Sequence, residues 1–268
     1  LSGGSLHLSS AKVTDGVFAL AIEPSDRSRA GDTTSTTNLK RIFRLGKSGK
    51  EKSKSDKDVF TIGDVELSGM SFKMVNFQKD ASKFGDEDIN WFDLYVSDIN
   101  LKGRKMKMKG PVMSGICDKM SFREKSGYAC YLLSGRTRVG DGKTVVEDLK
   151  LIDGWSNVDI PKFVMTYKDT DAWSDFISAV RMTANIDKST VSMHTLGYFA
   201  PALKNFHMTA RVKGNVDGYV NDLHLKGMQF ITSDADGFVD WDRAGGNGIS
   251  GELSGSIIGL PDSQAMLT

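Results

Sequence analysis

Few residues of this sequence have the types and spacing that catalysis or metal binding requires. The four histidines are scattered, and none has the spacing of a metal site or of a catalytic triad: His7, His194, His207 and His224. The sequence has no Gly-x-Ser-x-Gly elbow, no phosphate-binding P-loop and no dinucleotide-binding glycine motif following a strand. We therefore expect a protein that is not an enzyme, with no cofactor and no metal.

Two acidic stretches are further candidates for chemistry. Asp234-Ala235-Asp236-Gly237, with Asp240 and Asp242, resembles a calcium-binding loop. Its glycine stands at position 4 instead of 6, and no Glu closes the loop, so the pattern favours a polar turn. Asp86-Glu87-Asp88 could serve acid–base chemistry, but its place in a Gly-containing turn favours a solvated loop.

Cys117 and Cys130 are the only cysteines. Their spacing fits no zinc site, because zinc needs more ligands in close pairs. Paired, they would form a disulfide and indicate an oxidising compartment. Unpaired, they would be two small core residues, and this second interpretation is favoured.

The composition is typical of many strands joined by tight turns. Glycine is frequent, at 28 residues, and proline is rare, at 5. The net charge of +1 provides no global field that would recruit nucleic acid. No apolar run approaches the roughly 20 residues of a membrane-spanning helix. No signal peptide opens the sequence, and we expect the chain to be a segment of a longer protein.

The pattern of residues predicts three regions. Residues 1–35 are expected to hold two opening strands, separated by Thr14-Asp15-Gly16, and a loop. Residues 36–58 are expected to form a short helix and a Lys/Ser-rich linker. From Leu39 to Lys57 there are eight basic and two acidic residues. This stretch is interpreted as a solvated loop in preference to a patch for anionic lipid headgroups.

From Val59 to Thr268 alternation with a period of two predicts a mainly β region. Hairpins are expected around Glu124–Gly127, Gly140-Asp141-Gly142 and Lys213-Gly214-Asn215. Two short helical insertions are expected, near residues 170–181 and 195–204.

A recurring unit is the most informative feature of the sequence. Asp64–Met74 is one copy, Asp98–Met108 a second and Asp222–Thr232 a third, while a looser copy begins at Asp148 and a partial one at Glu252. In each full copy, two alternating apolar residues are followed by a glycine, after which apolar residues resume. In all three full copies they resume on the opposite parity.

A change of parity turns side chains to the other face of a strand unless a bulge or a sharp bend restores them. Repeated bends of this kind would curl a sheet into a trough with a continuously apolar inner face. The sequence therefore predicts an elongated, curled β-sheet groove with one or two short helices. An ordinary β-sandwich or solenoid whose core uses methionine remains an alternative. The 12 methionines favour a surface that meets variable apolar partners.

Three stretches together resemble a known family. They are Ile89–Leu101, Met120–Thr137 and Leu196–Leu203, and the Lys-rich linker followed by Phe60–Leu67 fits the same pattern. In this order they resemble the N-terminal half of TamB-like proteins, of the Bacteroidetes type, in the AsmA-like superfamily (the translocation and assembly module inner-membrane subunit). The resemblance spans most of Val59 to Leu260.

The resemblance implies a periplasmic protein that bridges the inner and outer membranes through a curled β-groove, often called a β-taco. The groove of such proteins conducts the acyl chains of phospholipids and so supports outer-membrane biogenesis. An N-terminal segment anchors them in the inner membrane, and a C-terminal domain meets an outer-membrane barrel of the Omp85 type. We expect both of these regions to lie outside this sequence. The family has no catalytic residues.

The expected lining of the groove comes from the recurring units. It comprises Val65, Leu67, Met70, Phe72, Met74, Ile99, Leu101, Met106, Met108, Leu223, Leu225, Met228 and Phe230. One alternative function is a scaffold that hands unfolded outer-membrane or surface proteins to the barrel through exposed strand edges. A second is a carbohydrate-active β-solenoid, which would need facing carboxylates and an aromatic platform.

Overall fold

The computed structural model describes residues 5–24, 35–38, 59–168, 172, 176–199, 201–205, 208–219, 222–232 and 249–255. The expected helix and linker at 39–58 and the acidic stretch 234–242 lie outside these residues. The described part is mainly β, as predicted, and its strands form one large sheet.

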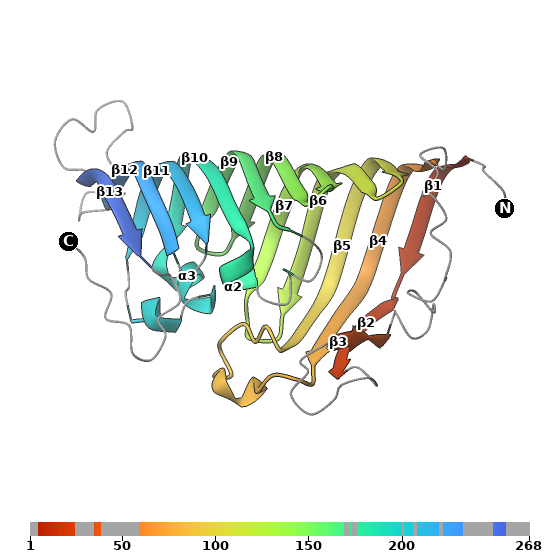
Figure 1. Ribbon diagram of the computed structural model, residues 1–268, viewed down its shortest axis with the longest axis horizontal. Helices are drawn as coiled ribbons and strands as arrows, with labels where there is room; N and C mark the ends of the chain where they lie inside the picture. The colour runs from red at the N-terminus through yellow and green to blue at the C-terminus, as the bar shows by residue number, and fades with distance from the viewer. Residues whose placement is uncertain are drawn as a thin grey trace.

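Thirteen strands make up this sheet. They are β1 (Leu6–Thr14), β2 (Val17–Pro24), β3 (Ser35–Thr37), β4 (Val59–Asn76), β5 (Asp93–Lys109), β6 (Val112–Glu124), β7 (Ala129–Gly140), β8 (Lys143–Asp153), β9 (Asn157–Thr166), β10 (Arg181–Ser192), β11 (Thr209–Tyr219), β12 (Asp222–Thr232) and β13 (Ile249–Gly255). From β4 to β13 each strand pairs antiparallel with the next, so the sheet is a continuous meander. Figure 1 shows the strands side by side along the longest axis of the molecule, with their upper ends bent over.

Two short strands share the edge of the long strand β4. β1 runs parallel to its first half, from Phe60 to Ser68, and β2 runs parallel to its second half, from Ser71 to Asn76. The break between β1 and β2 falls at Asp15-Gly16, as predicted. There the amide of Asp15 donates to Ser68 O at 2.9 Å, and the amide of Ser71 donates to Gly16 O at 2.9 Å.

Short helices interrupt the meander after β9 and β10. α2 (Phe176–Ala179) precedes β10, while α3 (Met193–Phe199) and the 3-10 turn η3 (Pro201–Leu203) follow it. A further turn, η1 (Ala81–Lys83), lies in the loop between β4 and β5, where Asp80 caps it by accepting from Ser82 N. Both helical insertions were expected from the sequence, and the structure has them close to the predicted positions.

Two glycines confirm the parity change that the recurring unit predicts. Gly69 and Gly227 have φ of +62° and +57°, a region that L side chains rarely adopt. The pairing register shifts at both places, between Leu67 and Met70 and between Leu225 and Met228. Each glycine is therefore a bulge that returns the following apolar residues to the same side of the sheet.

The second copy changes parity in a different way from the prediction. Gly103 has no positive φ, and Asp98 and Lys105 adopt φ of +51° and +54° instead. A second expectation was wrong, because no hairpin forms at Lys213-Gly214-Asn215. β11 runs straight through this segment, and the glycine faces the bulge of β12, where an added Cβ would lie 2.8 Å from the Cα of Met228.

Substitution of the two bulge glycines, Gly69 and Gly227, should destabilise the sheet to different extents. An added Cβ at Gly227 meets nothing within 4 Å, so Gly227→Ala should cost only the backbone strain of about 1–2 kcal/mol. At Gly69 the Cβ would also lie 2.4 Å from Asp15 Oδ1, so Gly69→Ala should cost more. Urea unfolding measures both, and Gly227→Asn should recover part of the loss because Asn tolerates this region. An equal loss for both alanine variants would contradict this account.

Candidate functional site

One row of side chains crosses nearly the whole sheet near the C-terminal ends of β5, β7, β9 and β11. We call it the first row. In register order it comprises Leu6, Phe60, Met108, Met113, Val139, Thr144, Met165, Met182, Gly218 and Leu223. Residues directly opposite each other on paired strands point to the same face. The row is therefore a line of side chains on one face from β1 to β12, apolar except at Thr144 and Gly218.

A second row crosses the sheet further along the strands. It comprises Val13, Leu67, Leu101, Met120, Leu133, Leu151 and Val158, again each opposite the next. On β7 the two rows fall on Val139 and Leu133, six residues apart, so alternation places them on the same side of the sheet. Packing across the bulge of β12 shows that the parity change there also keeps apolar residues on one side. Leu225, before the bulge of β12, and Met228, after it, both pack with Val212 in one cluster. We call the side that carries both rows the apolar face.

The opposite face, which we call the polar face, carries cross-strand ion pairs. Arg104 Nε lies 2.9 Å from Asp118 Oδ1, and Arg181 Nη2 lies 2.7 Å from Asp217 Oδ2. The guanidinium of Arg181 holds the pKa of Asp217 below its usual range. Further pairs are Lys12–Glu66, Lys125–Asp93, Arg136–Asp148 and Lys150–Asp159. These pairs are exposed, so they contribute solubility more than stability.

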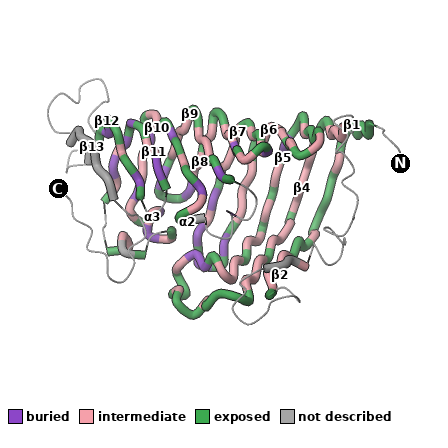
Figure 2. Tube along the Cα trace, in the orientation of Figure 1, coloured by how far each residue is buried: buried purple, intermediate pink, exposed green. Residues whose placement is uncertain are grey.

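The apolar face is accessible toward its N-terminal end. Met108 and Met113 are each 47% exposed, and Phe18 is 48% exposed although its ring stacks on Phe72 at 5.8 Å. Figure 2 shows mostly exposed and intermediate residues along β1 to β5, whereas more buried residues lie in β7 to β12. Large apolar side chains without cover indicate an interaction surface.

Two segments cover the lower end of this face. Tyr198 of α3 packs on a buried cluster of Ile89, Tyr128 and Cys130. The amide of Ile89 donates to Tyr198 O at 3.1 Å. Lys204 Nζ lies 2.6 Å from Asp88 Oδ1, so the acidic stretch 86–88 fastens this cover. The stretch 86–88 therefore supplies an ion pair to the cover, in addition to forming the turn that the sequence predicted.

A buried carboxylate fixes α3 to the turn between β8 and β9. Asp153 is 7% exposed, and its Oδ1 accepts from Trp155 N at 2.7 Å and Ser156 N at 2.6 Å. Its Oδ2 accepts from Thr195 Oγ1 at 2.8 Å, and Ser156 Oγ donates to the same hydroxyl at 2.7 Å. Burial, together with nearby Asp153, raises the pKa of Tyr128.

The predicted lining residues lie on β4, β5 and β12. Leu67, Leu101, Met108 and Leu223 belong to the two rows, and Met106 pairs with Ile62 between them. Val65 pairs with Gly103, Met70 with Ile99 and Met74 with Leu94, while Phe72 pairs with both Phe18 and Val96. Leu225 pairs with Val216, and Phe230 pairs with Val212. Met228 is only 2% exposed and packs in the cluster of Val212.

Sequence reasoning missed most members of the rows on β6 to β10. The recurring unit does not include them: Met113, Met120, Leu133, Met165 and Met182 all lie on strands between its copies or outside its pattern. Alternation within each hairpin could have identified them, because apolar residues stand at equal sequence distances on either side of each turn.

The two thiols are free in the structure, so the candidate disulfide is not formed. The register explains this, because Cys117 lies opposite Gly135 while Cys130 lies opposite Phe122. The two cysteines therefore stand about five residues apart along the paired strands. Burial raises the pKa of the Cys130 thiol to about 11.

Within the described residues no three His, Cys, Asp or Glu side chains come together as a metal site. The helices of the described part are all too short or too polar to span a membrane.

The fold and the surface define a class: an elongated β protein, built on one sheet, with an apolar and a polar face. The chain matches no protein-family model, no curated protein and no solved structure in the comparisons made.

Proposed function

We propose that the apolar face is the inner surface of an open groove that carries phospholipid acyl chains. The chain would then be a segment of a periplasmic, bridge-like protein that moves phospholipid between the inner and outer membranes. The resemblance to TamB-like proteins motivates the membranes and the compartment. The single observation that carries the acyl-chain part is the first row, whose ten consecutive paired positions are apolar side chains except at Thr144 and Gly218.

Physical chemistry supports a row over a pocket for this purpose. Each methylene that leaves water gains about 0.8 kcal/mol, wherever along an apolar surface it is buried. A row of this kind offers an acyl chain one apolar contact after another, so the chain can move without leaving a deep site. Methionine at Met108, Met113, Met165 and Met182 suits this, because its flexible thioether adapts to a moving partner.

A scaffold for unfolded proteins is the second candidate, and one observation favours it. Among the described strands, β1 pairs only with β4, so its other edge is unpaired over nine residues. An unpaired edge can add a strand from another chain.

Mass spectrometry of lipid extracted from the purified chain tests the proposal. Purified without detergent, the protein should carry phospholipid, and it should take up fluorescent phospholipid from vesicles when supplied without lipid. A folded protein that carries no lipid and takes none up would end the proposal for this segment. Bound peptide in place of lipid would favour the scaffold.

A further inference from the structure

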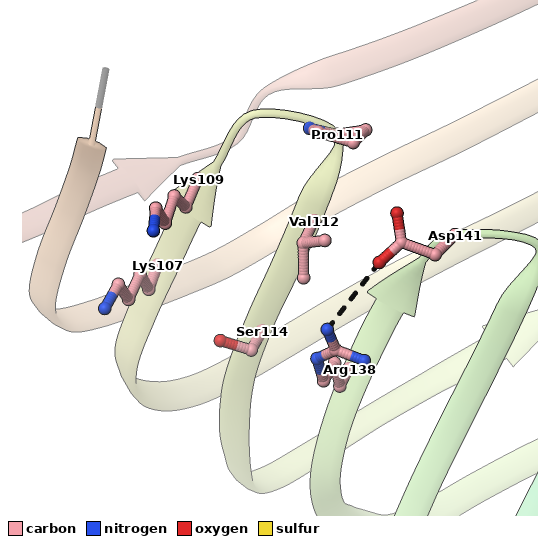
Figure 3. A pocket seen from close by; sticks show the side chains of 7 residues that line it. All are labelled: Lys107, Lys109, Pro111, Val112, Ser114, Arg138 and Asp141. Atoms are coloured by element: carbon pink, nitrogen blue, oxygen red, sulfur yellow. Dashed lines mark ion pairs between the residues drawn. The ribbon is translucent and has the colours of Figure 1, made fainter. Parts of the chain in front are cut away.

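A shallow hollow of about 430 Å³ lies at the upper end of β5, β6 and β7. Lys107 and Lys109 of β5, Ser114 of β6 and Arg138 of β7 line it, together with Asp141 of the following turn (Figure 3). Lys107 pairs with Ser114, and Ser114 pairs with Arg138. These three residues therefore share the polar face, in a line across neighbouring strands.

The hollow has an excess of positive charge that its surroundings do not neutralise. Three basic side chains and one acidic side chain line it. The acidic one, Asp141, pairs with Arg138, whose Nη2 lies 3.7 Å from Asp141 Oδ2. Within the described part of the chain, Lys107 and Lys109 make no ion pair, whereas nearby Arg104 and Arg136 are paired with carboxylates. Unpaired cations at a hollow provide sites for an oxygen anion.

The lysines can adjust to such an anion. In Figure 3 their side chains extend from β5 on the side away from Arg138. Each ammonium group sits on a flexible stem with rotatable donors, so it can turn toward a phosphate oxygen, while the planar guanidinium of Arg138 can bind two oxygens at once.

The apolar face begins on the other side of the same strand ends. Met108 and Met113 lie opposite each other there, 47% exposed, and their neighbours along the same two strands, Lys107, Lys109, Val112 and Ser114, line the hollow. We infer that the hollow binds the phosphate of an anionic phospholipid whose acyl chains pass over Met108 and Met113 onto the apolar face. This inference rests on the proposed function and adds to it a preference for anionic headgroups.

Uptake from two kinds of vesicle tests the inference. The native chain should take up phosphatidylglycerol about tenfold better than phosphatidylcholine at low salt, since each basic group near an anionic lipid contributes roughly a few-fold. The Lys107→Gln/Lys109→Gln/Arg138→Gln variant should lose this preference and keep its uptake of phosphatidylcholine. A matched control, Lys102→Gln/Lys119→Gln/Lys162→Gln, removes the same charge from exposed positions outside the hollow and should keep the preference.

The possible outcomes distinguish failure of the headgroup site from failure of the proposed lipid carriage. The headgroup site would be overturned, with lipid carriage left intact, if the Lys107→Gln/Lys109→Gln/Arg138→Gln variant kept the preference for phosphatidylglycerol. The same conclusion would follow if the control variant lost this preference equally. Uptake of neither lipid by the native chain would overturn both. Glycerol phosphate is the soluble ligand for comparison. If the native chain bound glycerol phosphate but showed no preference between the two kinds of vesicle, the hollow would be a site for a free phosphate and not for a lipid headgroup.

Discussion

A chain carrying Met113→Glu and Phe18→Glu is expected to bind at least about tenfold less phospholipid than the native chain. Both side chains are about half exposed, so the substitutions leave little buried volume unfilled. A carboxylate there must shed water whenever an acyl chain lies against it, which costs more than the roughly 1.4 kcal/mol that corresponds to tenfold. Lipid phosphorus per mole of protein, measured after vesicle incubation, gives the ratio.

The control adds the same two charges to the other side of the sheet. Thr166→Glu and Asn185→Glu lie exposed on the polar face, opposite Arg181 and Lys162 respectively. This variant should bind lipid as the native chain does. If both variants lose lipid equally, overall charge and not the apolar face governs binding, and the acyl groove must be abandoned.

Loss of the Asp153 carboxylate is expected to be the most destabilising single change considered. Asp153→Ala removes the acceptor of two backbone amides and of the Thr195 hydroxyl, all in a buried site. Hydrogen bonds to a charged group contribute about 1.5–3 kcal/mol each, and stranded donors add a desolvation cost, so we expect a loss of roughly 3 kcal/mol or more. Asp153→Asn keeps one acceptor oxygen and should lose about half as much.

Urea unfolding with hydrogen exchange measures both the size and the place of this effect. The amides of α3 should exchange faster in Asp153→Ala, because Thr195 no longer fastens the helix to the β8–β9 turn. Asp159→Ala is the control, since its ion pair with Lys150 is exposed and contributes at most about 1 kcal/mol. Similar losses in Asp153→Ala and the control would show that the buried network does not hold the helix.

The mainly β character, the meander of hairpins and the bulges at Gly69 and Gly227 could be predicted from local pattern. Alternation reports which residues share a face, and a glycine at a change of parity reports a bend, so both signals lie within a single strand. Lys213-Gly214-Asn215 misled the prediction because the same residues suit a hairpin turn. What decides between a turn and a continuous strand is the neighbouring bulge of β12, which local pattern does not contain.

The rows of the candidate site could be predicted only in part for a related reason. Leu67 and Leu101 are recognisable within their own copies of the recurring unit, but their alignment with Met120, Leu133 and Leu151 depends on the register of three further hairpins. Bulges at non-glycine residues such as Lys105 and Asp148 shift that register. Lys105 and Asp148 are not residue types that indicate a left-handed backbone conformation, so these bulges cannot be recognised in the sequence. The continuity of the face therefore becomes visible only once the strands are paired.

The meander has a consequence for how such a protein can change its length. The strong contacts between described strands join neighbours in the sheet, so the free energy of the sheet is close to a sum of terms for adjacent pairs. An added hairpin would bring its own two interfaces, extend the sheet by about 10 Å and leave the remaining interfaces unchanged. Evolution could therefore adjust the reach of the molecule without altering its cross-section.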